Sequence, residues 1–422
     1  MALESIIVHG GKPLHGTVTI SGSKNSALPI LAATLLTAEP CVVGGVPNLS
    51  DIRFMVEILQ HLGGKASFDP KQGVVTVQAR KVKSVAPYDL VRKMRASVCV
   101  LGPILARNHK VKVSIPGGCV IGPRPIDIHL KGLSRLGAKI TVEGGNVIAQ
   151  AKQLIGAEMF LGGRFGSTVL GTANVMMAAT LARGTTVIDS AACEPEIVDL
   201  ADFLNKMGAR VSGAGSPIIT IHGVESLHGA EHTVIPDRIE AGTFMCAAAI
   251  TGGEVTLKNA RADHLGALTD KLEESGVRVE RKGADIIVRR NGGLRSADVI
   301  TMPYSGFPTD LQAQYMVLMT ITPGLSIITE KIFPDRFMHV AELARLGAEI
   351  SLEGASAIVR GKKKLSGAPV MASDLRASAA LVLAGLVADG QTVVNRVYHI
   401  DRGYERIDQK LRALGARIER KR

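Results

Sequence analysis

One phrase recurs six times along this chain of 422 residues, each time after a run with helical periodicity. Its form is Leu-Gly-Ala-basic-Ile, and the segments 136–140 and 414–418 are clear copies. The glycines lie 74, 71, 68, 71 and 68 residues apart, at positions 63, 137, 208, 276, 347 and 415. A period of this length indicates repeats of one supersecondary unit. We therefore expect an α/β fold with six copies of one unit, grouped as two domains of three.

The order of elements within a repeat follows from its periodicity. Apolar residues such as Ile197, Leu200 and Leu204 precede the phrase at helical spacing. The glycine is expected to end that helix in a left-handed conformation, and two strands follow it. An earlier helix, rich in small residues that allow tight packing, is expected at 26–36, 96–106, 172–182, 241–250, 311–321 and 377–388.

Polar and cationic residues mark the starts of these small-residue helices. They are Ser23-Lys24-Asn25, Arg95-Ala96-Ser97, Ser167-Thr168, Asp237-Arg238, Thr309-Asp310 and Asp374-Leu375-Arg376. Helix N-termini expose unpaired N–H groups and attract anions, more so beside Lys or Arg. If several of these ends face one cleft, the cleft binds phosphates and carboxylates. Alternatively, each Ser, Thr or Asp only caps its own helix.

Composition narrows the class of partner. The net charge of +12 favours anionic partners, but the basic residues are dispersed and aromatic residues make up only 3%. Few stacking platforms and no recognition motif argue against a nucleic-acid-binding protein. The N-terminus lacks the features of a signal peptide, and no apolar run approaches the ~18 residues that span a membrane. We expect small-molecule substrates, no nucleic acid and no membrane insertion.

Five cysteines without a C-x-x-C pair predict neither a disulfide framework nor a zinc site, and favour a reducing, cytoplasmic location. Cys119 differs from the others because it follows Gly117-Gly118 and precedes Arg124, in a loop flexible at one end and stiff at the other. A thiol near cations can act as an acid or as a thiolate. A small buried apolar role is expected instead for Cys99, Cys193 and Cys246.

Two acidic residues have two possible roles each. Asp310 and Asp374 stand at expected helix starts, where they either cap the helix or act on a substrate.

Lys24 lies in a glycine-bounded helix start, Ser21-Gly22-Ser23-Lys24-Asn25, which lacks the spacing of a nucleoside-triphosphate loop but suits a phosphate or carboxylate ligand. The charged segment 401–406 is either part of a site or a solvated turn.

Taken together, these segments closely resemble the UDP-N-acetylglucosamine enolpyruvyl transferase (1-carboxyvinyltransferase) family over essentially the whole chain. The segments that carry the resemblance are 21–25, 94–97, 116–119, 124–128, 194–198, 236–240, 307–310, 335–339, 374–378 and 399–406. The resemblance implies two inside-out α/β barrel domains of three repeats each, joined by a double crossing. It places one domain at 24–235 and the other at 1–23 plus 236–422. It also implies transfer of the enolpyruvyl group of phosphoenolpyruvate to the 3-hydroxyl of UDP-N-acetylglucosamine, toward peptidoglycan, with no cofactor and no metal.

The resemblance further implies individual roles. Cys119 would protonate the methylene carbon and would be the thiol that fosfomycin alkylates, and Asp310 would take the proton of the sugar hydroxyl. The implied catalytic set is Cys119, Asp310, Lys24, Arg402 and Asp374. The implied substrate-binding set is Lys24, Asn25, Arg95, Arg124, Pro125, Ile126, Asp127, Ile128, Thr168, Val169, Asp310, Ile332, Arg336, Arg376 and Arg402.

One segment departs from the family pattern. The diphosphate-binding stretch appears as 167–172, and the Lys that often precedes it is absent; Arg164 is a candidate to replace its charge. Two alternatives to the implied activity stay open. One is the related 3-phosphoshikimate enolpyruvyl transferase, which is not expected to carry the Gly-Gly-Cys loop. The other is a non-catalytic UDP-sugar-binding paralog, against which the intact charged positions argue.

Overall fold

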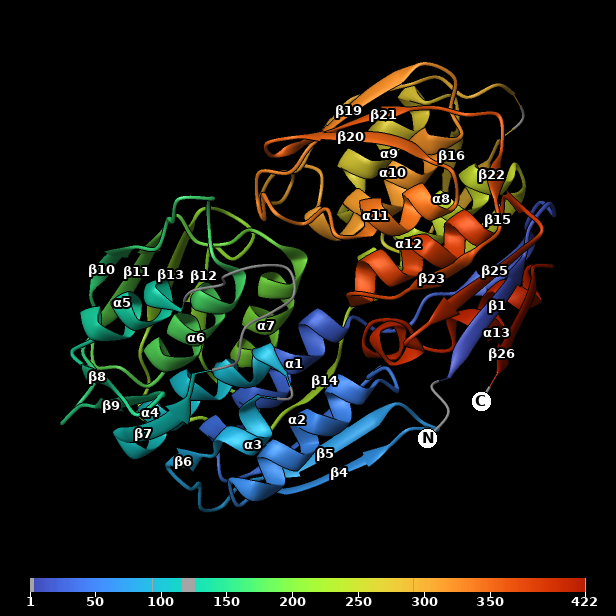
Figure 1. Cartoon of the computed structure of the whole chain (residues 1–422). Helices are drawn as coiled ribbons and strands as arrows, with labels where there is room; N and C mark the ends of the chain where they lie inside the picture. The colour runs from blue at the N-terminus through green and yellow to red at the C-terminus, as the bar shows by residue number, and fades with distance from the viewer. Residues whose placement is uncertain (1–3, 93, 116–125, 291, 422) are drawn as a thin grey trace. The chain divides into compact units, whose positions relative to one another are not determined.

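The computed structural model describes residues 4–92, 94–115, 126–290 and 292–421. The described residues form a mixed α/β fold, as expected, and divide into two compact units (Figure 1). Unit 1 comprises residues 4–21 and 236–421, and unit 2 comprises residues 22–115 and 126–235. Cys119, Arg124 and Pro125 lie outside the described residues, so their predicted roles are not located by the structure.

Within the described residues, each unit contains three four-stranded sheets. Those of unit 2 are β14(Glu231–Thr233)-β3(Pro40–Gly44)-β5(Val74–Gln78)-β4(Lys65–Asp69), β6(Val85–Ala86)-β7(Lys110–Ser114)-β9(Asn146–Gln150)-β8(Lys139–Glu143) and β10(Glu158–Phe160)-β11(Thr185–Asp189)-β13(Ile218–His222)-β12(Arg210–Ser212). Those of unit 1 are β2(His15–Thr19)-β15(Glu254–Lys258)-β17(Asp285–Arg289)-β16(Arg278–Lys282), β18(Val299–Ile300)-β19(Leu325–Thr329)-β21(Ser356–Arg360)-β20(Glu349–Glu353) and β23(Pro369–Met371)-β25(Gln391–Asn395)-β1(Ser5–His9)-β26(Arg417–Lys421). A short pair, β22(Leu365–Ser366) and β24(Ala388–Asp389), completes unit 1.

All six four-stranded sheets of the described chain share one pairing pattern. The first strand pairs parallel with the second, and the two remaining pairings are antiparallel. A parallel pair needs a crossover connection, which helices provide in these repeats. The common pattern agrees with the six repeats of the sequence.

Three pairings join strands that lie far apart in the sequence. β2 precedes α1 (Lys24–Ala33) of unit 2 but pairs with β15 in unit 1, while β14 precedes α8 (Arg238–Thr251) of unit 1 but pairs with β3 in unit 2. The two repeats have therefore exchanged their first strands. In addition, the sixth repeat ends after β26, and the N-terminal strand β1 supplies its missing strand.

The helices fall into two kinds. The small-residue helices are α1 with η1 (Thr34–Leu36), η2 (Arg95–Val100) with α4 (Leu101–Asn108), α6 (Val169–Ala179), α8, η4 (Thr309–Leu311) with α10 (Gln312–Thr320), and α12 (Leu375–Gly385). The helices that end at the repeated phrase are α2 (Ser50–His61), α5 (Asp127–Arg135), α7 (Pro195–Lys206), α9 (Gly266–Glu274), α11 (His339–Arg345) and α13 (Ile407–Ala413). Shorter turns are α3 (Tyr88–Val91), η3 (Ala262–His264) and η5 (Val397–Arg402).

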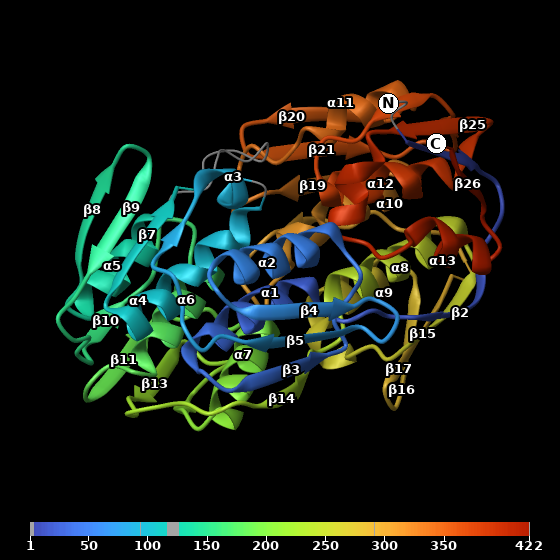
Figure 2. The ribbon, with the colours of Figure 1, turned by 90° about the horizontal axis from the view of Figure 1, so that it is seen from below.

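Small-residue helices form the centre of each core. Every residue of α10 is buried, as are residues 239–250 of α8. In unit 2, α4 packs on α6 so closely that a Cβ at Gly102 would overlap the backbone oxygen of Asn174. Figure 2 shows β3, β4 and β5 side by side along α1 and α2. The small side chains are therefore needed for backbone contact between helices.

The six repeated glycines have the predicted conformation. Each follows the end of its helix with a left-handed backbone, at φ between 83° and 99°. Non-glycine residues adopt such angles at a cost, because Cβ approaches the following carbonyl oxygen. The glycines therefore end the helices and turn the chain into the next strand.

This conformation predicts the effect of substitution at Gly347. Its φ is +83° and nothing lies within 4 Å of a Cβ built there, so any cost of Gly347→Ala comes from the backbone alone. We expect a loss of ~1–2 kcal/mol in the free energy of unfolding, measured by urea denaturation. Gly266→Ala is the control, because Gly266 is equally open but lacks a positive φ. Equal stabilities for the two variants would contradict the argument.

Candidate active site

Three helix starts converge in unit 1. Asp237 caps α8 by accepting from the N–H groups of Ile239 and Glu240, and Asp374 caps α12 by accepting from those of Arg376 and Ala377. The Arg376 guanidinium in turn donates a hydrogen bond to Asp310 of η4. The Asp237 carboxylate is near enough to contribute to the raised pKa of Arg376. Polar helix starts are predicted from the sequence, and these three lie together in the structure.

The Asp310 carboxylate lies between two guanidinium groups. Its Oδ1 accepts from Arg336 Nη1 at 2.8 Å, and its Oδ2 lies 3.3 Å from Arg376 Nε. The Asp310 side chain is 28% exposed, whereas those of Arg336 and Arg376 are 6% and 2% exposed. The pairing thus presents one partly exposed carboxylate, backed by two buried cations.

Both arginines remain charged. Burial by itself disfavours a charged guanidinium, but the carboxylates of Asp310, Asp374 and Glu330 more than offset it and raise the pKa of Arg336. For Arg376, burial is outweighed by Tyr404 and then Asp310, so its pKa is also raised. Removing Asp310 would leave two buried cations with less compensation, which is costly.

The two acidic residues left open by the sequence have different roles here. Asp374 is a helix cap, with Oδ1 at 2.8 and 3.1 Å from two backbone nitrogens. Asp310 is the second residue of η4, whose N-cap is Pro308, and its carboxylate pairs with the two arginines. Capping is therefore observed for Asp374, and ion pairing with Arg336 and Arg376 for Asp310.

The residues that hold Arg376 in place were not predicted from the sequence. Its guanidinium lies over the Tyr404 ring, 5.2 Å from the centroid. The Tyr404 hydroxyl is 2.9 Å from Thr243 Oγ1 and accepts from Gln314 Nε2 at 3.0 Å. Gln314 also donates to the Asp310 carbonyl at 3.0 Å. The spacing of four residues between Asp310 and Gln314, one helical turn, was the available signal.

Ile332 and Arg402 lie in unit 1 as well. The Ile332 N–H donates to the Glu330 carboxylate at 2.9 Å, so this N–H is already engaged. Arg402 ends η5 and is half-buried. Burial and then the Arg402 charge lower the pKa of His399, which places the guanidinium near that ring.

In unit 2, Lys24 begins α1 as predicted, but its ammonium is not free. It is 6% exposed and lies 3.1 Å from Asp51 Oδ2 in the first turn of α2. The preceding Ser23 caps α1 by accepting from the Ser26 N–H, and Asn25 is half-buried. A ligand of Lys24 would therefore share it with Asp51.

Asn174, in the middle of α6, links η2, α5 and α6. Its amide donates to the Val98 carbonyl at 3.1 Å and lies 3.0 Å from His129 Nδ1. Arg95 begins η2 half-buried, near enough to His129 to affect its pKa. The other predicted ligands here are Ile126, which is buried, Asp127, which is exposed, and the half-buried Ile128, Thr168 and Val169.

Thr168 and Arg164 belong to the segment that departs from the family pattern. The Thr168 hydroxyl caps α6 by accepting from the Gly171 N–H at 3.2 Å. Arg164 is exposed and stacks over Phe165, with 5.3 Å between the guanidinium carbon and the ring centroid.

The helix caps differ between the two units. Unit 2 caps α1 and α6 with the neutral Ser23 and Thr168, whereas unit 1 caps α8 and α12 with the anionic Asp237 and Asp374. A carboxylate offsets the partial positive charge of a helix start, and a hydroxyl does not. The alternative that the polar residue caps its own helix therefore holds at the starts of α8 and α12.

The cysteines largely follow expectation. Cys99 and Cys246 are fully buried, and burial raises the pKa of each thiol to about 12. Cys193 was expected to be buried too, but it is half-buried, with its thiol 3.7 Å from the Ala191 carbonyl. The four described cysteines are free thiols.

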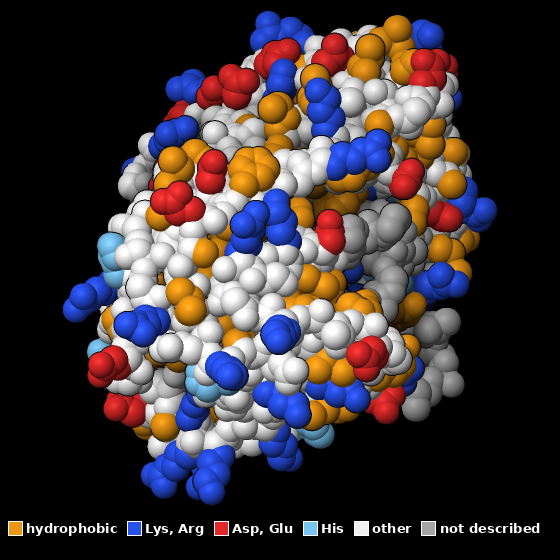
Figure 3. All heavy atoms as spheres, turned by 90° about the vertical axis from the view of Figure 1, so that its left-hand side faces the viewer, with side chains coloured by type: hydrophobic (Ala, Val, Ile, Leu, Met, Phe, Trp, Pro, Cys, Tyr) orange, Lys and Arg blue, Asp and Glu red, His pale blue; other side chains and the backbone are white. Residues whose placement is uncertain are grey.

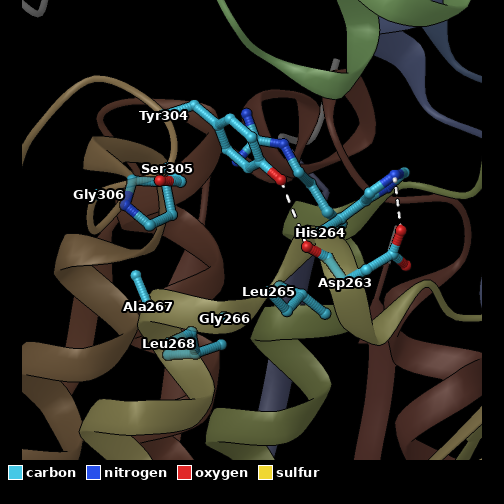
Figure 4. Close-up of a pocket in the computed structure, with 11 residues that line it drawn as sticks. Asp263, His264, Leu265, Gly266, Ala267, Leu268, Tyr304, Ser305 and Gly306 are labelled. Carbon is cyan, nitrogen blue, oxygen red and sulfur yellow. Dashed lines mark hydrogen bonds and ion pairs between the residues drawn. The ribbon is translucent and has the colours of Figure 1, made fainter. Parts of the chain in front are cut away.

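A small cavity elsewhere in unit 1 does not belong to this cluster (Figure 4). It has a volume of about 60 Å³ and lies between the start of α9 and the 304–306 segment. The Tyr304 hydroxyl donates to the Asp263 carbonyl at 3.3 Å beside it. Neither Asp310 nor an arginine that pairs with it lines this cavity, which has room for a few water molecules only.

The surface and the described elements add three observations. Lys and Arg side chains are spread over the face in Figure 3 among acidic and apolar groups, rather than gathered in a stripe. None of the helices in the described ranges is long and apolar enough to cross a membrane. Among the same residues, no group of three His, Cys, Asp or Glu side chains could hold a metal ion.

His129 gives a pH-dependent prediction. Burial, and then Arg95, lowers its pKa from 6.5 to about 4, and the Asn174 amide donates to Nδ1, which requires the neutral ring. His129 therefore takes up a proton near pH 6.5 in the unfolded chain, but only near pH 4 in the folded chain. The contribution of the neutral His129 to the free energy of unfolding is fully present above pH 6.5 and is lost as the pH falls toward 4.

The test compares wild type with His129→Gln in urea denaturation at pH 7 and pH 5. Wild type should lose up to about 2 kcal/mol more than the variant over this interval, because the variant lacks this titration. Parallel losses in the two proteins would show that His129 does not contribute. His339, whose pKa burial also lowers to about 4, remains in both proteins and cancels in the comparison.

Comparison with known proteins supplies a family context. The family model of EPSP synthase (3-phosphoshikimate 1-carboxyvinyltransferase) matches residues 8–411. The UDP-N-acetylglucosamine 1-carboxyvinyltransferases of Methylacidiphilum infernorum (isolate V4) and Akkermansia muciniphila are 57% and 54% identical to this chain, with 99% of each chain covered. The crystal structure of the enolpyruvyl transferase NikO from Streptomyces tendae matches with a TM-score of 0.89 at 26% identity, covering 99% of both chains. EPSP synthase from Acinetobacter baumannii shares the fold, with a TM-score of 0.76 at 20% identity and full coverage of both chains.

Proposed function

This chain belongs to the UDP-N-acetylglucosamine 1-carboxyvinyltransferase family, and we propose that it transfers the enolpyruvyl group of phosphoenolpyruvate to the 3-hydroxyl of UDP-N-acetylglucosamine with release of phosphate. This reaction is the first committed step of peptidoglycan synthesis. The observation that carries the proposal is identity of 52% to 57% with six such transferases over at least 98% of this chain.

Asp310 is the proposed general base that takes the proton of the sugar hydroxyl. Its carboxylate is partly exposed and lies between Arg336 and Arg376. Nearby cations favour the ionised form of a carboxylate, which is the form that accepts a proton. The proton that the methylene carbon gains would come from Cys119.

The remaining residues are proposed to bind substrate. Lys24, Arg124 and Arg402 would hold phosphoenolpyruvate, and Asn25, Arg95 and the Ile332 backbone would hold the sugar. Residues 124–128, Thr168 and Val169 would hold the diphosphate and the uracil, with Arg164 as a possible source of charge. The neutral Thr168 cap supports this assignment, because it leaves the positive end of α6 uncompensated. Arg336 and Arg376 would contribute fixed positive charge, and Asp374 would hold the start of α12.

The arrangement of domains is also a proposal. Three sheets of one pattern in each unit support two inside-out α/β barrels, at 24–235 and at 1–23 plus 236–422, joined by a double crossing. Free thiols at the four described cysteines support a reducing, cytoplasmic location. With Cys119 as the acid, the chain would be a target of fosfomycin.

A second candidate is 3-phosphoshikimate enolpyruvyl transfer, because the matching family model carries that description. The solved EPSP synthases are only 19% and 20% identical to this chain and support the fold rather than the substrate.

Phosphate release from phosphoenolpyruvate distinguishes the two candidates. We expect release that depends on UDP-N-acetylglucosamine and is absent with shikimate 3-phosphate, measured with equal concentrations of the two acceptors. Release with shikimate 3-phosphate alone would reverse the assignment. If no phosphate is released with either acceptor, the protein is better explained as a non-catalytic binding protein.

Asp310→Asn tests the proposed base. An amide can still bond the sugar but cannot take its proton, so kcat should fall by ~10²–10⁴-fold. The melting temperature should fall as well, because Asn leaves the buried Arg336 and Arg376 without a paired charge. Turnover is therefore measured at saturating substrate and at a temperature where circular dichroism shows the variant folded.

Asp335→Asn is the matched control. It removes the same charge from an exposed position next to Arg336, so kcat and the melting temperature should stay near wild type. A folded Asp310→Asn variant with normal kcat would exclude Asp310 as the base.

A further inference from the structure

Glu330 is a completely buried carboxylate, at 0% exposure, between β19 and the 331–336 segment. It accepts from the hydroxyls of Thr301 at 2.6 Å and Thr309 at 2.8 Å. It also accepts from the backbone N–H groups of Ile332 at 2.9 Å and Phe333 at 3.0 Å. Four neutral donors thus satisfy both of its oxygens.

These contacts fix the direction of the hydrogen bonds toward Asp310. A guanidinium only donates, so the Thr309 oxygen must accept from Arg336, and the single hydroxyl proton goes to Glu330 Oε2. The Thr309 oxygen accepts from Arg336 Nη1 at 3.0 Å. The same Nη1 donates to Asp310 Oδ1 at 2.8 Å. The chain Glu330–Thr309–Arg336–Asp310 therefore has one allowed orientation.

On the basis of the proposed function, we propose that Thr309 and Glu330 are positioning residues for the transfer, which hold Arg336 against the Asp310 carboxylate. Neither residue is expected to touch a substrate in this role. Glu330 orients the Thr309 hydroxyl so that its oxygen, and not its proton, faces the guanidinium. The bond from Thr309 removes rotational freedom from a long side chain that would otherwise pair with Asp310 in several geometries.

Thr309→Val tests the proposal, because it keeps the shape and removes the hydroxyl. Thr301→Val is the matched control, since it also takes one hydroxyl donor from Glu330 but makes no bond to Arg336. Thr309→Ser keeps the hydroxyl and serves as the rescue. For each variant, kcat with phosphoenolpyruvate and UDP-N-acetylglucosamine, its pH dependence and the melting temperature are measured.

We expect Thr309→Val to lower kcat by ~10–100-fold, the effect of a displaced catalytic group. The acid limb of its pH profile should move to higher pH, because a loosened Arg336 stabilises the ionised Asp310 less. Thr301→Val should lower the melting temperature by about as much as Thr309→Val does, but its kcat and pH profile should stay near those of wild type. Thr309→Ser should stay near wild type in all three measurements. Equal kcat values for Thr309→Val and Thr301→Val would overturn the proposal.

Glu330→Gln tests the direction of the chain and covers the case in which Thr309→Val does not fold. Its amide nitrogen, placed toward Thr309, would turn the hydroxyl proton toward Arg336, so the same loss of kcat and the same shift of the acid limb are expected. An unchanged profile would contradict the proposal. If the wild-type protein releases no phosphate with UDP-N-acetylglucosamine, the proposed function is wrong and this inference falls with it. If the wild type is active and Thr309→Val and Glu330→Gln keep its kcat and pH profile, only the inference is overturned.

Discussion

Small-residue helices without a solvent-facing side are the constraint from which the site follows. All of α10 and nearly all of α8 and α12 are buried, and α4 and α6 touch through their backbones. A helix buried all round satisfies its own interior backbone groups, so its unpaired backbone N–H groups lie only at its start. The polar residues of the candidate site therefore gather at helix starts, where unpaired N–H groups need partners in any case.

The buried arginines make Asp310 important for folding as well as for the proposed chemistry. Arg376 is 1% exposed and depends on Asp310, on the Tyr404 ring and on the helix-start carboxylates to remain charged. A buried cation of this kind is costly unless it is paired and hydrogen-bonded. The same contacts also immobilise the carboxylate, which a general base requires. Stability and positioning are thus consequences of one set of bonds.

The sequence predicted local structure better than pairing. The glycine at position 347 and its five equivalents were predicted in the left-handed conformation because that conformation depends only on neighbouring residues. The resemblance assigned residues 1–23 to the domain of 236–422, but the individual partners of β2, β14 and β1 were not predicted, because strand periodicity shows which face is buried and not which strand lies alongside. Glu330 and Gln314 were missed for a related reason: charge and polarity usually indicate exposure, and burial is a property of the folded chain.

The difference between the helix caps suggests how the two units divide the proposed chemistry. Ser23 and Thr168 satisfy helix N–H groups without adding charge, so the starts of α1 and α6 keep their attraction for an external anion. Asp237 and Asp374 neutralise the starts of α8 and α12 from within, and an incoming phosphate there would meet a carboxylate. These caps support the proposal that unit 2 holds the diphosphate and that unit 1 supplies the carboxylate base between fixed cations. The identity of a capping residue, Ser or Thr against Asp, thereby decides whether a helix start serves a ligand or the protein itself.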